Sequence, residues 1–272
     1  MAFWVAAAGF LAVLAAAVVL YRRGRDRIYA ELAAGFSGSA HSTPFEAHVN
    51  HADARSLATI FLSERLVRVP EFLDPATLAR LRDEALSGFA RMESSFIPLH
   101  KKGNTLSYEQ ILRSAPHLGG FYHSRAMQGW VSIVTGMRVG PTPVRDQSSL
   151  SLLCYKDAGD HIGWHFDHNF YRGRHFTVLL ALVNRSADAG PSSCRLERQL
   201  DDETVQQIDT SENTLVLFEG SRVRHRATPA APGDLRIMLS MTYCEDPRIS
   251  PANELARRLK DTAYYGIRAL WD

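Results

Sequence analysis

The segment His165-Phe166-Asp167 constrains the fold of this chain more than any other stretch of its sequence. Side chains alternate along an extended segment, so His165 and Asp167 point to the same side and can share a metal ion. His225 follows 58 positions after Asp167, just beyond the strand-like run from Thr214 to Phe218. Two imidazoles and one carboxylate are the ligand set of a non-haem iron(II) site. Such a site needs a rigid framework that brings His225 in from a different strand.

A basic residue, Arg236, lies 11 positions beyond His225 on another strand-like run. With these residues the chain resembles the iron(II)- and 2-oxoglutarate-dependent oxygenases, and among them the prolyl-4-hydroxylase-like branch, from about Leu66 to Asp246. The resemblance implies that the three residues above are the iron ligands and that Arg236 pairs with the distal carboxylate of 2-oxoglutarate. A planar guanidinium suits this role, because it donates two parallel hydrogen bonds to a carboxylate and stays charged.

The resemblance implies further residues at the cofactor. Tyr155 matches the tyrosine of the family's Y-x-x-G segment, whose phenol hydrogen-bonds 2-oxoglutarate. Arg174 to Thr177 resemble its R-x-x-T strand, in which the arginine faces the substrate and the threonine lies near the cosubstrate. Ser240 shares a strand face with Arg236, so we expect it beside the carboxylate that Arg236 holds. The alternative for Ser240 is a serine packed inside a barrel.

Two departures from the family pattern lie near the substrate side. Ala181 replaces a frequent tyrosine, and Ala189 to Cys194 replace a Gly-Gly-Glu-Thr segment. Both argue against peptidyl proline as the substrate. His161 and His168 flank the proposed ligands and are interpreted either as substrate-facing or as surface histidines.

The resemblance implies a hydroxylase that uses iron(II), 2-oxoglutarate and dioxygen, with ascorbate as a further candidate, and that releases succinate and carbon dioxide. Related halogenases carry Gly or Ala at the position of Asp167, so that halide can occupy the vacated iron position. A carboxylate there favours hydroxylation of an unactivated C–H bond in a small or lipidic substrate. The alternatives are a peptidyl-proline hydroxylase, a nucleic-acid demethylase, a zinc hydrolase and a non-catalytic cupin-like metal-binding or sensing module.

The hydrophobic pattern predicts an α+β fold, mainly β: an antiparallel jelly roll, or double-stranded β-helix, buttressed by N-terminal helices. Helices are expected from Asp74-Pro75, from Tyr122 to Thr135, and from Ser250-Pro251 to about Leu259. The polar stretch from Glu93 to Gly120 is expected to be an irregular lid loop. The expected strands are Leu66 to Pro70, Ser149 to Tyr155, His175 to Asn184, Cys194 to Leu200, Asn213 to Phe218 and Leu235 to Tyr243.

The N-terminus predicts a membrane anchor. Ala2 to Tyr21 carry no charge, and 20 helical residues reach about 30 Å, the thickness of a bilayer core. Four arginines follow within six residues, which orients the rest of the chain towards the cytoplasm. We therefore expect a single-pass anchor over residues 1–21, a juxtamembrane linker over 22–50 and one oxygenase domain over 51–272. A misread signal peptide or an alanine-rich helix packed on a partner is the alternative.

Composition excludes two classes of protein. The net charge is only +2 and the basic residues are scattered, so the basic surface of a nucleic-acid-binding protein is not expected. The cysteines Cys154, Cys194 and Cys244 are odd in number and widely spaced, which fits neither a disulfide framework nor a zinc motif. The expected partners are a small or lipidic substrate and the membrane, and the oligomeric state is left open.

Overall fold

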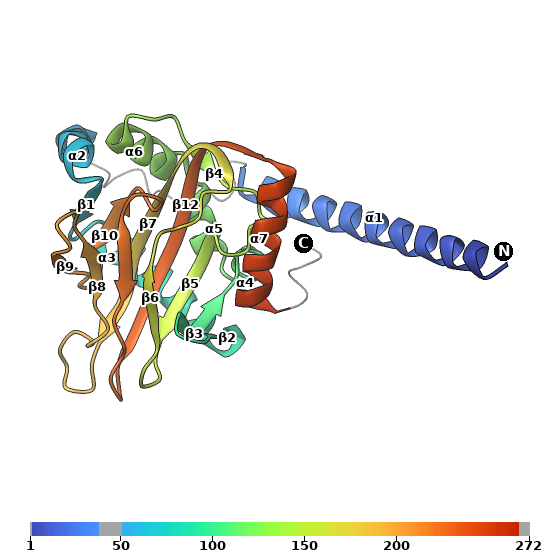
Figure 1. Ribbon diagram of the computed structural model, residues 1–272. Coiled ribbons are helices and arrows are strands. Elements are labelled where there is room, and N and C mark those ends of the chain that lie inside the picture. Colours follow the sequence, from blue (N-terminus) through green and yellow to red (C-terminus); the bar gives the residue numbers. More distant parts are fainter. Residues whose placement is uncertain (1, 38–50, 267–272) are drawn as a thin grey trace.

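The computed structural model describes residues 2–37 and 51–266, and a single 12-stranded sheet dominates it (Figure 1). The main strand order is β1-β10-β7-β12-β5-β3-β6-β11-β8-β9, with β2 paired to β3 and β4 paired to β12. All paired strands are antiparallel, and the sheet curls into a nearly closed barrel. The predicted jelly roll is confirmed.

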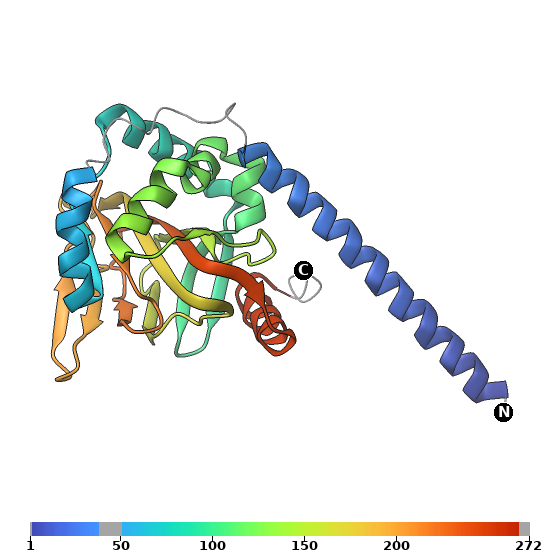
Figure 2. The same ribbon diagram turned by 90° about the horizontal axis from the view of Figure 1, so that it is seen from above.

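The strands are β1 (Leu66–Val69), β2 (Glu93–Ile97), β3 (Lys101–Leu106), β4 (Gly140–Pro141), β5 (Leu150–Tyr155), β6 (His161–His165), β7 (Tyr171–Arg185), β8 (Leu196–Gln199), β9 (Val205–Ile208), β10 (Leu215–Phe218), β11 (Arg224–Ala227) and β12 (Leu235–Ile249). The helices are α1 (Ala2–Ser37), α2 (His51–Glu64), α3 (Pro75–Ser87), the 3-10 helix η3 (Phe89–Arg91), α4 (Tyr108–Ser114), α5 (Pro116–His123), α6 (Arg125–Thr135) and α7 (Pro251–Tyr265). Seen from above, helices from the middle of the chain gather along one side of the strands, and α7 lies on the opposite side (Figure 2).

Strands β7 and β12 form the centre of the fold. Each is 15 residues long, and they pair antiparallel from Leu235 opposite Arg185 to Ile249 opposite Tyr171. One face of these strands is strongly apolar and packs on the helices as part of the main core, for example through Phe176. The other face lines a cavity inside the barrel. Alternation along two strands thus separates core from cavity.

The helix boundaries follow local capping chemistry. Asp74 caps α3 as predicted, because its side chain accepts hydrogen bonds from the backbone N–H groups of Ala76 and Thr77, both at 3.0 Å. Ser124 caps α6 in the same way by accepting from Met127 N at 3.1 Å. This cap divides the single helix predicted for residues 122–135 into α5 and α6.

The segment from Glu93 to Gly120 is not the predicted lid loop. It forms the hairpin of β2 and β3, then α4 and most of α5. Strand β3 pairs with both β5 and β6 and so connects the two sides of the barrel. Ser107 starts α4 with a capping box that includes Gln110. The polar composition reflects a hairpin that faces solvent on one side.

Helix α1 does not end at the predicted boundary of the anchor. It continues to Ser37, and its C-terminal half packs on α4 and α5, with Tyr29 buried and Arg25 paired to Glu109 at 2.5 Å. The linker predicted for residues 22–50 is therefore wrong over 22–37, where no proline interrupts the helix; residues 38–50 lie outside the described part of the chain. Most side chains of the anchor predicted for residues 1–21 also lie outside it. Among the side chains that are described, no helix is both long and apolar enough to cross a membrane.

Asn213 offers a test of how the helical layer is joined to the barrel. It adopts the left-handed conformation with φ at 65°, accepts from Leu73 N at 2.9 Å and donates to Leu73 O at 2.7 Å. We expect Asn213→Ala to lower the free energy of unfolding by about 2–4 kcal/mol, since two hydrogen bonds and a favourable φ are lost. Asn213→Gly keeps the conformational freedom and should lose roughly half of that. Urea unfolding measures both, and an alanine variant as stable as the wild type would contradict this account.

Candidate metal centre

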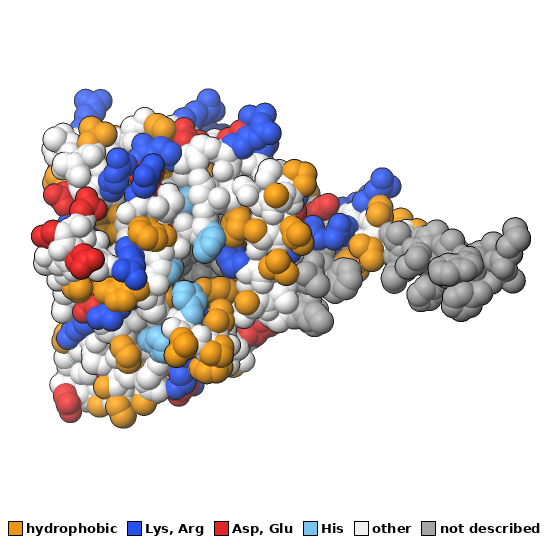
Figure 3. Space-filling model, in the orientation of Figure 1, with side chains coloured by type: hydrophobic (Ala, Val, Ile, Leu, Met, Phe, Trp, Pro, Cys, Tyr) orange, Lys and Arg blue, Asp and Glu red, His pale blue; other side chains and the backbone are white. Residues whose placement is uncertain are grey.

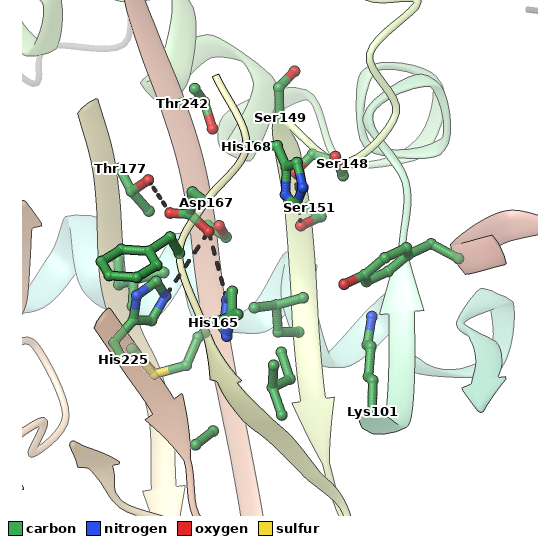
Figure 4. Close-up of a pocket in the computed structure, with 18 of the residues that line it drawn as sticks. Lys101, Ser148, Ser149, Ser151, His165, Asp167, His168, Thr177, His225 and Thr242 are labelled. Carbon is green, nitrogen blue, oxygen red and sulfur yellow. Dashed lines mark hydrogen bonds and ion pairs between the residues drawn. The ribbon is translucent and has the colours of Figure 1, made fainter. Parts of the chain in front are cut away.

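Three side chains converge inside the barrel from the positions that the sequence predicted. His165 ends β6, and His225 of β11 lies directly opposite it in the strand pairing, with the ring centroids 4.2 Å apart. Asp167 Oδ1 is 3.5 Å from His165 Nε2 and 3.8 Å from His225 Nε2 (Figure 4). One ligand atom from each residue lies within 4.8 Å of the others, which is close enough for one metal ion.

Backbone carbonyls orient both imidazoles. His165 Nδ1 is 2.8 Å from Gly163 O, and His225 Nδ1 is 3.0 Å from Val223 O. If each Nδ1–H donates to its carbonyl, each Nε2 keeps its lone pair for a metal. Metal-binding histidines commonly show this arrangement.

Hydrogen bonds also hold Asp167 in place. Thr177 donates to Oδ2 at 2.5 Å, and the backbone N–H of Asp167 donates to Gly220 O at 2.9 Å. A Cβ atom at Gly220 would lie only 2.4 Å from Oδ2, so only glycine fits behind the carboxylate. Thr177 was predicted to lie near the cosubstrate, and in the structure it donates its hydrogen bond to Asp167. Because Oδ2 is bound in this way, Oδ1 of Asp167 faces the two imidazoles.

The electrostatics of the centre keep two of its three residues in the form that binds metal. Burial raises the pKa of the Asp167 carboxyl, but the nearby imidazoles and the Thr177 hydroxyl outweigh it and hold that pKa well below its usual range. Burial lowers the pKa of the His225 imidazole to about 4. For His165, burial lowers the pKa but the hydrogen bond to Asp167 raises it, and the net shift is upward. At neutral pH Asp167 is therefore ionised and His225 neutral, which are the forms that bind metal.

The centre opens into a cavity of about 280 Å³, and histidine side chains surround its mouth in the space-filling view (Figure 3). Towards one end, Arg236 lies opposite Tyr155, and next to them Met238 lies opposite Leu153. Leu179 of β7 lines the same section. Along these strands, the cationic Arg236 is therefore followed by a belt of apolar side chains.

Arg236 is a buried guanidinium with few partners. It is 1% exposed, its Nη2 donates to Thr210 Oγ1 at 3.1 Å, and its Nη1 is 3.9 Å from Cys194 Sγ. Its Nε has no hydrogen-bond partner, and no described carboxylate forms an ion pair with it. Burying an unpaired charge is costly unless a ligand supplies the counter-charge. The residues present therefore fit an anion such as the distal carboxylate of 2-oxoglutarate.

Two predicted site residues lie elsewhere than expected. Arg174 does not line the cavity: it points to the outer side of β7 and pairs with Glu219 at 2.8 Å. The reason is strand alternation, because its neighbour His175 takes the inward direction. Ser240 lines the cavity opposite Ser151, but four residues along a strand, about 13 Å, separate it from Arg236. It does not lie beside the carboxylate that Arg236 would hold.

The other predicted residues meet the cavity. Tyr155 is buried, and its ring lies 5.5 Å from the Arg236 guanidinium carbon. His168 is exposed at the cavity wall, where its ring stacks on Phe170 at 5.9 Å. His161 is absent from the lining, and its Nδ1 is 2.8 Å from Gly159 O.

Sequence reasoning missed several polar groups of the lining. Lys101 and His175 are each 2% exposed, and both ring nitrogens of His175 lack a hydrogen-bond partner among the described residues. Lys260 reaches the cavity from α7 and pairs with Asp146 at 3.2 Å. A lysine in a polar stretch is ordinarily solvated, so no sequence signal marked Lys101, and its burial follows from its inward position on β3.

Solved structures with this fold include several related enzymes. A prolyl hydroxylase from Trichoplax adhaerens, in complex with a hypoxia inducible factor peptide, superposes with a TM-score of 0.60 at 15% identity, covering 75% of this chain and 94% of that chain. A prolyl-4-hydroxylase from Pseudomonas putida gives 0.55 at 14% identity, covering 71% and 98%. The non-heme alpha ketoglutarate dependent epimerase SnoN from nogalamycin biosynthesis gives 0.57 at 17% identity, covering 71% and 83%.

A search of curated proteins found no match. The structural likenesses confirm the predicted fold. A family model gives the finer placement, because it matches residues 49–262. This chain belongs to the HalD family, described as Halogenase D.

Proposed function

We propose that this protein hydroxylates an unactivated C–H bond of a small or lipidic substrate, using iron(II), 2-oxoglutarate and dioxygen and releasing succinate and carbon dioxide. One observation carries the proposal: a two-histidine, one-carboxylate cluster shares a cavity with a buried arginine that has no carboxylate partner among the described residues. A metal site alone would have no need for that arginine.

The residues divide the work between them. His165, Asp167 and His225 would hold iron, which supplies the chemistry that couples decarboxylation of 2-oxoglutarate to oxidation of the substrate. Arg236 would hold the distal carboxylate of 2-oxoglutarate. The apolar belt formed by Met238, Leu153 and Leu179 matches the two methylene groups between the ends of that molecule, and it keeps water from the ion pair.

Halogenation is the second candidate, and the description of the family favours it. Asp167 favours hydroxylation, because its carboxylate occupies the place that halogenases leave to halide by carrying Gly or Ala. Thr177 and Gly220 support the choice, since both hold the carboxylate in place. Mass spectrometry of products formed with chloride present separates the two: insertion of oxygen supports hydroxylation, and insertion of chlorine would overturn it.

Two other readings have less support. The solved prolyl hydroxylases share the fold, but at 14–15% identity this likeness does not indicate that the substrates are the same. Arg174, which the resemblance to that branch placed facing the substrate, points away from the cavity. A non-catalytic metal-binding or sensing module would leave the buried Arg236 without a purpose.

The proposal includes a membrane location, with a single pass near the N-terminus and the catalytic domain in the cytoplasm. It rests on the uncharged sequence from Ala2 to Tyr21 and the arginines that follow. Because α1 continues into the contacts of Arg25 and Tyr29 with the domain, an anchored enzyme would be held by a rigid helix (Figure 1). A substrate delivered from the membrane suits that arrangement.

The iron ligands can be tested directly. Asp167→Ala and His225→Ala should each abolish iron(II) binding and 2-oxoglutarate turnover, because losing a direct ligand costs more than the roughly 10- to 100-fold typical of a group behind the ligands. His161→Ala is the matched control and should bind iron normally. Anaerobic iron titration and succinate release measure the outcome, and unchanged succinate formation in either ligand variant would refute the assignment.

The role of Arg236 has its own test. Arg236→Leu should weaken 2-oxoglutarate binding by about 100-fold or more while iron binding persists, because a buried carboxylate without its partner costs about 3–5 kcal/mol. Arg236→Lys should be intermediate, since it keeps the charge and loses the planar fork. Arg174→Leu is the control. If Arg174→Leu weakens 2-oxoglutarate binding more than Arg236→Leu does, Arg174 holds the carboxylate instead.

The anchor is tested by deleting residues 2–21, which spares Arg25 and its contact with Glu109. We expect the full chain in the membrane fraction with its catalytic domain protected from external protease, and the truncated chain in the cytosol. If the substrate comes from the membrane, cells with the truncated chain should form much less product. Full product formation by the cytosolic variant would remove the case for a membrane-delivered substrate.

A further inference from the structure

Lys101 is a buried lysine for which the described part of the chain supplies no counter-ion. It begins β3, is 2% exposed, donates to Thr105 Oγ1 at 3.3 Å, and has its Nζ 4.4 Å from the centroid of the Tyr264 ring. No carboxylate of the described residues forms an ion pair with it. Burial, with a smaller contribution from Lys260, lowers the pKa of Lys101 to about 7.

Two other lysines, Lys260 and Lys102, each lie close to an aspartate. Lys260 lines the same cavity and pairs with both Asp146 at 3.2 Å and Asp261 at 3.3 Å. Lys102 points to the other side of β3, where it is within 3.6 Å of Asp160 and donates to Ala158 O. An unpaired buried charge costs stability, and the cost disappears when a ligand supplies the opposite charge.

The position of Lys101 separates it from the proposed 2-oxoglutarate site. It rises from β3 across the cavity from Asp167 and His225, and its ammonium group points into the space under the aromatic ring from α7 (Figure 4). If Arg236 holds one carboxylate of 2-oxoglutarate and the metal centre takes the other, Lys101 is left for a different molecule. That step rests on the proposed function.

We infer that Lys101 binds an anionic group of the primary substrate, either a carboxylate or a phosphate, and so places the substrate between itself and the metal centre. Ser151 also lines the cavity, and its hydroxyl, which is 3.4 Å from Ser148 O, can turn to donate a hydrogen bond to an anionic oxygen. His100 fixes the ring of Tyr264 beside the ammonium group, since its Nε2 is 3.1 Å from the Tyr264 hydroxyl. The substrate is thus an anion with an apolar part.

The test uses the full chain loaded with iron(II) and 2-oxoglutarate under anaerobic conditions. Octanoate and octyl phosphate are titrated by calorimetry, one for each source of the charge. We expect at least one of them to bind the wild type, and Lys101→Met to bind it about 10-fold or more weakly. Lys102→Met is the matched control and should bind as the wild type does. The anion with the larger loss identifies the chemistry of the substrate.

A stability measurement distinguishes binding from a structural role. Methionine matches the lysine stem in size and removes the unpaired charge, so Lys101→Met should raise the thermal midpoint of the ligand-free protein. A structural lysine would lower it. The inference is overturned if neither anion binds the wild type, if Lys101→Met binds both as well as the wild type, or if the variant is destabilised.

One rival outcome has a separate signature. If Lys101→Met loses affinity for 2-oxoglutarate while alkyl anions bind unchanged, Lys101 serves the cosubstrate and the inference is wrong. Failure of the proposed function looks different again, because the wild type itself would then bind no 2-oxoglutarate, whatever the alkyl anions do.

Discussion

The antiparallel ladder between β7 and β12 is the constraint on which the rest of this structure depends. Both strands are 15 residues long, and their alternating side chains form the main core on one face and a polar cavity on the other. Arg236 and Thr177 are therefore placed by the same hydrogen bonds that hold the fold together. Rigid strands position functional groups more accurately than loops do.

The cavity concentrates polar groups that the fold does not satisfy. Among the described residues, Arg236 and Lys101 are both buried basic groups without a carboxylate partner, and His175 is buried with neither ring nitrogen hydrogen-bonded. Each of these groups lowers the stability of the empty protein, and a binding site commonly shows this conflict between stability and function. Under the proposed function, Arg236 would serve the cosubstrate and Lys101 the substrate.

The carboxylate of Asp167 bears on which reaction this member of the family carries out. The family is described as a halogenase family, yet this chain keeps a carboxylate beside the two histidines. The carboxylate depends on its surroundings: Thr177 donates to one oxygen, and Gly220 leaves the space that this oxygen needs. A change of chemistry in this family would therefore involve the residues around position 167 as well as position 167 itself.

Local patterns in the sequence predicted the shared orientation of His165 and Asp167, the jelly roll and the capped start of α3, whereas the places of His225 and Arg236 came from the family resemblance. Spacing along a strand, period-two hydrophobicity and helix capping are all short-range properties. Short strands such as β11 were not predicted, because their pairing partners are distant in sequence. Arg174 and His175 are neighbours on β7, and alternation from the inward Thr177 turns His175 inward and Arg174 outward, against the role that the family resemblance implied for Arg174. Tertiary structure alone decided that Glu219 pairs with Arg65 and Arg174 and that Lys101 has no counter-ion among the described residues, because ion pairing depends on which charges the fold brings together.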